Sequence, residues 1–142
     1  MVAYPALFIP EVDDGFSVTF RDLPEANAFG DDLRGTLEAA MYGLAVALEF
    51  RIRDNEPWPL PSPAGADERL ITLPVLVEAK LALMRRMHET GTTKVELARL
   101  LGVSEGAVRR LLRFDHRSHI DRIEAALERL GSRLELRLRR AA

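Results

Sequence analysis

The sequence predicts an α+β protein built in two parts. In the first part, apolar or alternating segments flank tight-turn residues and lead into one long amphipathic stretch. This indicates a sheet that starts with a β-hairpin and has a helix packed on it. In the second part, short helical segments alternate with capping and turn residues, which indicates a mostly α helix-turn-helix unit that ends in a β-strand. With 142 residues, of which 47% are hydrophobic, the chain fits one domain or two small ones.

The first strands are predicted over residues 4–9 and 16–20. The Asp-Asp-Gly sequence at 13–15 favours a tight turn between them, because glycine tolerates a positive φ and aspartate caps its own backbone. Strict alternation over residues 16–20 places three large apolar side chains on one face of the second strand. A short third strand is expected within residues 26–30.

A long helix is expected next, capped by Asp31 or Asp32 and ending near Asp54. Its apolar residues recur every three or four positions, which predicts a stripe that covers the buried face of the hairpin. The stripe consists of Leu33, Leu37, Met41, Leu44, Leu48 and Ile52.

Residues 55–64 contain four prolines and favour an extended linker. Trp58, the only tryptophan, either folds back onto the long helix or stacks on a ligand. A last short strand is expected over residues 69–73. Pro74 then suits the first turn of a helix that reaches about Glu89, and its apolar side should carry Val77, Leu81, Met84 and His88. Composition changes over residues 65–75, so the sequence predicts domains at 1–66 and 75–142, with the last strand and a linker at 67–74.

Residues 93–112 carry the most informative pattern. Thr93 and Glu96 form a capping box, Gly102 permits a sharp turn, and Ser104 can cap the next helix. Ala98 is small where the second helix must cross closely over the first, and the apolar residues around it can form one small core. They are Leu97, Leu101, Val103, Val108 and Leu111. The pattern predicts a helix-turn-helix, and the alternative is a helical hairpin with a solvated basic face.

In a helix-turn-helix the second helix enters the major groove of DNA. The residues expected toward base edges are Ser104, Glu105, Gly106 and Arg109, and those expected at phosphates or the flank are Lys94, Arg110, Arg113, His116 and Arg117. Arg109 suits a bidentate contact to guanine. Gly106 weakens a helix by about 0.5–1 kcal/mol relative to alanine, so either the helix is weak there or its backbone comes close to DNA, and the base preference at this position stays open.

A further helix, capped by Ser118 or His119, is expected to reach Leu130, with Gly131 ending it. Leu134, Leu136 and Leu138 then alternate with charged residues, which predicts a C-terminal strand. An isolated strand leaves its backbone groups unpaired. It therefore pairs either with the same strand of a second chain, forming a dimer, or with another segment of its own chain.

Charge is divided unevenly. Residues 1–66 hold four arginines and eleven acids, a net −7, whereas residues 67–142 hold sixteen basic residues and eleven acids, a net +5. Two partners of opposite charge would explain this, and so would two ordinarily solvated surfaces.

Several function classes lack support. No segment is long and apolar enough to span a membrane, the N-terminus does not resemble a signal peptide, and the absence of cysteine agrees with a reducing cytoplasm. His116 and His119 beside Asp115 and Asp121 suit helix flanks better than a metal site, and no nucleotide-binding or hydrolase motif occurs. We therefore expect no catalytic residue, no metal and no cofactor.

The order of the motifs resembles the HicB family of bacterial antitoxins, in its version with a C-terminal helix-turn-helix. In the first half the matching segments are YPALF, DDG, RDLP, GDDLRGTLEAA and NEPWPLPSP. In the second half they are KLALMRRM, ELARLLGVS, RRLL and IEAALERLGSRLEL. Arg21 stands where the family usually has proline, and Glu25-Ala26 replaces its usual Gly-Cys-like pair, so the loop there is expected to differ.

The resemblance implies a truncated RNase H-like fold that binds and neutralises a small, basic, HicA-like mRNA-cleaving toxin. It also implies repression of the protein's own operon by toxin and antitoxin together, in the bacterial cytoplasm. Asp13, Asp14 and Asp22 are expected toxin contacts because of their charge and position. The alternatives are a stand-alone transcriptional regulator whose acidic half senses a small molecule or protein, and an RNA-processing enzyme.

Overall fold

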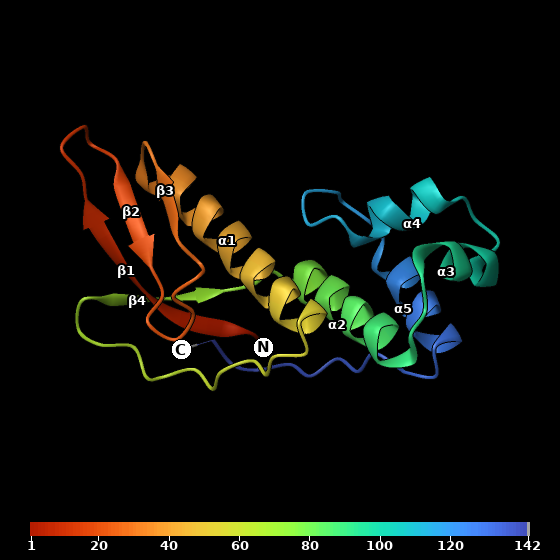
Figure 1. Ribbon diagram of the computed structural model, residues 1–142. Coiled ribbons are helices and arrows are strands. Elements are labelled where there is room, and N and C mark those ends of the chain that lie inside the picture. Colours follow the sequence, from red (N-terminus) through yellow and green to blue (C-terminus); the bar gives the residue numbers. More distant parts are fainter. Residues whose placement is uncertain (142) are drawn as a thin grey trace.

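A four-stranded antiparallel sheet forms one end of the molecule and a group of short helices forms the other, with two longer helices between them (Figure 1). The computed structural model describes residues 1–141. The elements in chain order are β1 (Ala3–Pro10), β2 (Phe16–Thr19), β3 (Ala28–Gly30), α1 (Leu33–Arg53), β4 (Glu68–Thr72), α2 (Val75–Thr90), α3 (Lys94–Leu101), α4 (Glu105–Leu112) and α5 (Ile120–Arg129). The α+β class is therefore confirmed.

The predicted hairpin is confirmed. Pro10 pairs with Phe16, and the Glu11 amide donates to the Gly15 carbonyl at 2.8 Å. Asp14 adopts a φ of +64°, in the left-handed region that the turn requires. Gly15 is needed for another reason, because a Cβ there would lie only 2.6 Å from the Gly30 carbonyl oxygen of β3.

The sheet order is β3-β2-β1-β4, and all neighbours are antiparallel. β4 follows the proline linker and pairs with β1 on the side opposite β2. The segment after the linker thus returns to complete the N-terminal sheet before the chain enters α2.

α1 covers one face of this sheet (Figure 1). Asp32 supplies the cap, accepting the Gly35 amide at 2.7 Å. Leu44, Leu48 and Ile52 are buried as the stripe predicts. Leu33, in contrast, is exposed in the first turn, and deeper in the helix the small residues Ala40 and Ala47 complete the contact with the sheet.

The linker folds back on the N-terminal core. The Trp58 indole donates to the Leu48 carbonyl oxygen at 3.2 Å, and the Arg85 guanidinium lies 4.2 Å from the centre of its ring. The Tyr4 hydroxyl donates to the Pro59 carbonyl at 2.6 Å. Of the two roles considered for Trp58, packing onto α1 is therefore confirmed.

α2 is shared by two hydrophobic cores. Leu81 packs with the sheet and α1, whereas Leu83 and Met87 pack with the short helices α3, α4 and α5. The single apolar stripe predicted for α2 therefore accounts for only part of its packing, because the helix contributes to both cores. His88 is exposed rather than packed, and its Nε2 lies 2.7 Å from the Asn55 side-chain oxygen.

The C-terminal segment differs most from the prediction. Leu134 packs partly against the second core, but residues 134–138 form no strand in the single chain. Leu136 and Leu138 are 92% and 95% exposed. The tail runs from α5 back toward the end of the molecule that holds the sheet (Figure 1) without joining it. Pairing within its own chain is thus not observed, and pairing with a second chain stays a prediction.

Candidate protein-binding and DNA-binding surfaces

The helix pair α3–α4 begins and ends at the residues that the sequence indicates. The Thr93 hydroxyl accepts the Glu96 amide at 3.1 Å and donates to the Glu96 carboxylate at 3.0 Å. Gly102 ends α3 with a φ of +66°, and the Ser104 hydroxyl accepts the Ala107 amide at 3.1 Å. Both caps are local side-chain contacts, which explains why sequence alone locates them.

The core beneath these helices is largely the predicted one. Leu97, Ala98, Val108 and Leu111 are buried, together with residues of α2 and α5. Val103, in the turn, is exposed instead, because the sharp turn at Gly102 directs the chain away from the core.

The predicted DNA contacts lie on α3, on α4 with its cap and in the segment after α4, and all but one are exposed. Gly106 is partly buried, and the others are exposed: Lys94, Ser104, Glu105, Arg109, Arg110, Arg113, His116 and Arg117. Arg109 pairs with Glu105 at 2.8 Å, within one turn of α4. Arg113 forms a two-pronged contact to Asp115, at 3.0 and 2.7 Å, and this hydrogen bonding lowers the pKa of the Asp115 carboxyl. Within residues 1–141, Lys94, Arg110 and Arg117 have no carboxylate partner.

Gly106 brings the basic side chains of α4 close to its backbone. A Cβ at this position would meet the Arg110 Nη1 atom at 3.6 Å and the Arg109 Nη2 atom at 3.9 Å, which are ordinary contact distances. Alanine therefore fits at this position in the free protein.

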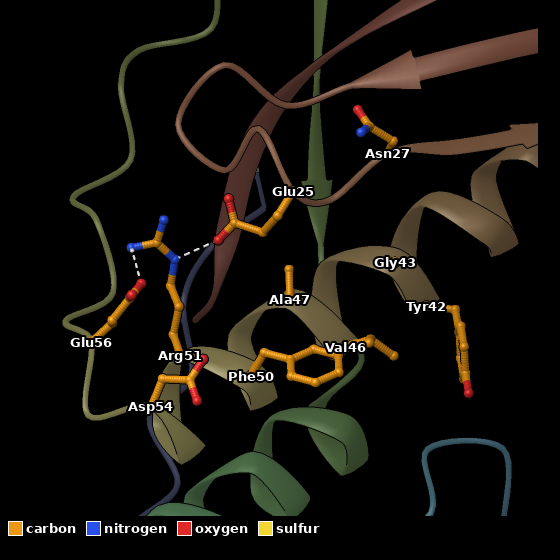
Figure 2. A pocket seen from close by; sticks show the side chains of 10 residues that line it. All are labelled: Glu25, Asn27, Tyr42, Gly43, Val46, Ala47, Phe50, Arg51, Asp54 and Glu56. Atoms are coloured by element: carbon orange, nitrogen blue, oxygen red, sulfur yellow. Dashed lines mark hydrogen bonds and ion pairs between the residues drawn. The ribbon is translucent and has the colours of Figure 1, made fainter.

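A second surface, which the sequence reasoning did not identify, lies on the outer side of α1 (Figure 2). It is a groove of about 590 Å³, called here the α1 groove. Its lining residues are Glu25, Asn27, Tyr42, Gly43, Val46, Ala47, Phe50, Arg51, Asp54 and Glu56. The available signal was the spacing of Tyr42, Val46 and Phe50, which places a second apolar stripe on the helix face opposite the buried one.

Small residues open the α1 groove and large ones border it. Gly43 lets the chain before β3 approach closely, since a Cβ there would lie 3.3 Å from the Asn27 carbonyl oxygen. Tyr42 and Phe50 are 57% and 49% exposed on the same helix. Exposed aromatic side chains beside a hollow are typical of protein-binding surfaces.

The rim of the α1 groove is acidic. Arg51 is its one cation, and it pairs with Glu25 at 2.6 Å and with Glu56 at 3.9 Å. The hydrogen bond from Arg51 lowers the pKa of the Glu25 carboxyl. Asp54 adds a further carboxylate, so the rim carries three acids and one base.

The three acidic residues predicted to contact a partner are not equivalent. Asp13 and Asp14 are exposed in the β1–β2 turn, at the end of the molecule away from α3 and α4 (Figure 1). Asp22 instead accepts the amide and the hydroxyl of Ser62, at 2.8 and 2.7 Å. Its pKa is lowered, because burial, which alone would raise it, is outweighed by these hydrogen bonds and by the nearby Arg21 charge. Asp22 thus ties the linker to the loop after β2.

A second hollow, of about 850 Å³, lies between the two surfaces. α1 contributes Tyr42 and Arg53 to it, and α4 contributes Arg109. The candidate surfaces on α1 and α4 are therefore neighbours, although they are 50 or more residues apart in the sequence.

The described part of the chain has no helix long and apolar enough to cross a membrane. Among residues 1–141, no three histidine, aspartate or glutamate side chains gather as metal ligands would.

Comparison with known proteins gives consistent results. The family described as HicB-like antitoxin of bacterial toxin–antitoxin system matches residues 3–82. The chain is 35% identical to the antitoxin HicB of Escherichia coli K12, over 94% of this chain and 96% of that protein. It is 37% identical to antitoxin HicB 2 of Photorhabdus laumondii, over 94% of each. Identity to the antitoxin HicB of Pseudomonas fluorescens is 36%, over 92% of this chain and 90% of the relative.

Proposed function

Because the chain belongs to the HicB family of antitoxins from bacterial toxin–antitoxin systems, we propose that it neutralises a small, basic, HicA-like toxin and represses its own operon. The observation that carries the first half of this proposal is the α1 groove, an aromatic hollow with an acidic rim on the acidic half of the chain. It suits a partner that presents apolar side chains flanked by lysine or arginine.

The toxin is held by shape and charge in this proposal. Tyr42 and Phe50 supply contact area, and the carboxylates of Glu25, Asp54 and Glu56 complement a basic surface. The net −7 charge of residues 1–66 speeds the encounter and competes with RNA for the toxin. Asp13 and Asp14 contribute to that attraction from the far end of the sheet, whereas Asp22 acts in the fold.

Repression is assigned to α3 and α4. The base edges are contacted by Ser104, Glu105, Gly106 and Arg109. The phosphates or the flank are contacted by Lys94, Arg110, Arg113, His116 and Arg117. The C-terminal residues Leu134, Leu136 and Leu138 pair with those of a second chain. The resulting dimer, or a tetramer built from two dimers, binds a palindromic operator with half-sites roughly 10 bp apart.

The antitoxin itself performs no catalysis in this proposal. An RNase H-like nuclease holds divalent metal with clustered carboxylates, one of them normally in the first strand. β1, Ala3–Pro10, contains no acidic residue. We accordingly assign no cofactor and place the protein in the bacterial cytoplasm with its toxin.

Co-expression with the product of an adjacent small reading frame tests the proposal. We expect a stable complex on pull-down and restored growth of cells that express the toxin. A stand-alone regulator would bind DNA, but its gene would have no adjacent small reading frame, or it would not bind the product of that frame. A nuclease would cleave RNA as a purified chain in the presence of divalent metal. Either result would contradict the antitoxin role.

Substitution of two exposed phenylalanines then tests where the toxin binds. Phe50→Ala in the α1 groove should weaken toxin binding about tenfold or more, as expected for an aromatic anchor. Phe29→Ala is the matched control, since Phe29 is also exposed but lies on the edge strand β3. If Phe29→Ala weakens binding and Phe50→Ala does not, the toxin binds at the sheet edge near Asp13 and Asp14 instead.

A further inference from the structure

Lys80, on α2, is fully buried, with 0% of its surface exposed. Its ammonium nitrogen donates to the carbonyl oxygens of Arg113 at 2.5 Å and His116 at 2.8 Å, and to the Ser118 hydroxyl at 2.9 Å. A longer contact of 3.4 Å reaches the Arg110 carbonyl oxygen. Every one of these acceptors belongs to the last turn of α4 or to the segment that follows it.

Burial of this cation is costly, and the structure compensates it with neutral oxygens rather than with a salt bridge. Desolvation lowers the pKa of the Lys80 ammonium, and the negative charge of Asp115 only partly opposes this shift. A hydrophobic side chain of similar size would fill the same space without that cost. The lysine therefore serves a purpose other than filling the core.

The carbonyl acceptors lie at the C-terminal end of α4 and in the segment after it, where each also accepts a backbone amide. α4 ends at Leu112, and Arg113 already has extended backbone angles, with φ −76° and ψ 132°. The C-terminal end of a helix carries partial negative charge. Lys80 adds hydrogen bonds and positive charge there, and so joins the end of α4 to residues 113–118.

The two ends of this contact belong to different parts of the molecule. α2 packs on the sheet core through Val77 and Leu81. Residues 110–118 include Arg110 and Arg113, and they directly follow Arg109. Lys80 thus links the N-terminal core directly to the helix that bears the candidate DNA contacts.

We propose that Lys80 is a positioning residue for operator recognition, which orients α4 by holding its C-terminal end and residues 113–118. This rests on the proposed DNA binding by α4. Lys80 does not touch DNA in this proposal, since it is buried. It acts through Arg109 and Arg110, whose direction relative to the rest of the dimer depends on the anchored end of the helix.

Operator binding by the full-length Lys80→Met variant tests the proposal. Methionine keeps the apolar stem and removes the donors. We expect the operator Kd to rise about tenfold, the equivalent of misplacing one base contact. Binding to unrelated DNA, which depends on charge alone, should change much less. Toxin neutralisation should persist.

Ile123→Val is the control for a general loss of stability, because Ile123 is also fully buried but lies on α5. Both variants are measured well below their melting temperatures. Equal operator affinity of Lys80→Met and wild type, or an equal loss in Ile123→Val, would overturn the positioning role. If wild type itself binds no DNA upstream of its operon, the proposed repressor function fails as well.

A second variant keeps the proposal testable if Lys80→Met does not fold. Ser118→Ala removes one acceptor and leaves the lysine in place. It should raise the operator Kd by a smaller factor and increase amide hydrogen exchange in residues 113–118. Unchanged exchange and unchanged operator affinity in this variant would contradict the proposal.

Discussion

The ring of Phe114, which follows α4, packs edge-on against the ring of Tyr42 on the outer face of α1. The ring centres are 6.4 Å apart and the planes are inclined by 82°. Tyr42 borders the α1 groove, and Phe114 follows Arg113 directly. The proposed toxin surface and the proposed DNA surface therefore meet at one aromatic contact.

Phe114→Ala should lower the free energy of unfolding by about 1–3 kcal/mol, because a half-buried ring is lost from the N-terminal core. Urea denaturation of this variant, of Tyr42→Ala and of the double variant measures the pair. We expect a coupling energy of about 0.5–1.5 kcal/mol. Strictly additive losses would show that the two rings do not stabilise each other.

Arg109→Ala should weaken operator binding by about 1–3 kcal/mol, because a bidentate contact to guanine is lost. Fluorescence anisotropy with operator and unrelated duplexes measures this, and toxin neutralisation should be unaffected. Arg122→Ala, an exposed arginine on α5, is the control. Loss of neutralisation in Arg109→Ala would show that the two surfaces do not act separately.

Gly106→Ala should stabilise α4 by about 0.5–1 kcal/mol, because alanine has the higher helix propensity and no close contact opposes it. Thermal unfolding measures the gain. If DNA approaches the backbone at this position, operator affinity falls while stability rises. A rise in both would show that Gly106 is not required for contact with DNA.

Asp22→Asn should lower stability at pH 7 by about 1–2 kcal/mol, because the amide replaces a charged acceptor of two hydrogen bonds. The folded-state pKa of Asp22 is lowered, so its contribution is present above the ordinary aspartate pKa and is lost as the pH falls through the folded-state pKa. The difference between wild type and variant should therefore shrink below about pH 4.

Urea unfolding at several pH values checks this dependence. Asp13→Asn is the control, because Asp13 lies exposed in the β1–β2 turn. A difference between wild type and Asp22→Asn that is the same at pH 7 and pH 3 would contradict the assigned role of the Asp22 carboxylate.

Replacing both Leu136 and Leu138 by aspartate should abolish dimer formation. Both side chains are almost fully exposed in the single chain, and the proposed dimer buries them against a second chain. Sedimentation would show a monomer, and operator binding should fall with loss of the second half-site. Leu60→Asp is the matched control, an exposed leucine in the linker. A dimer that survives the double substitution would place the interface elsewhere.

Features set by neighbouring residues were predictable from the sequence. The turn at residues 13–15, the caps at Asp32, Thr93 and Ser104, and the end of α3 at Gly102 each depend on side chains within a few positions. The order of short motifs likewise predicted the family, and the similarity to known antitoxins confirms it. The DNA contacts were predicted as a group on the same basis, and their role stays a prediction.

Other features depend on residues that only folding brings together. Asp22 meets Ser62 across 40 positions, and Lys80 meets His116 across 36. A lysine in an amphipathic pattern predicts an exposed side chain, and no local signal says that four oxygens from the end of α4 and the segment after it will surround it. The α1 groove likewise combines residues of α1 with Asn27 of the segment before β3, which lies against the helix at Gly43. The sequence by itself determined the hairpin turn and the helices with their caps, because those depend on hydrogen bonds between neighbouring residues, but it did not determine that residues 134–138 form no strand in the single chain. The tertiary structure decided which charged and aromatic side chains are buried, paired or left free to bind, because desolvation depends on neighbours distant in the chain.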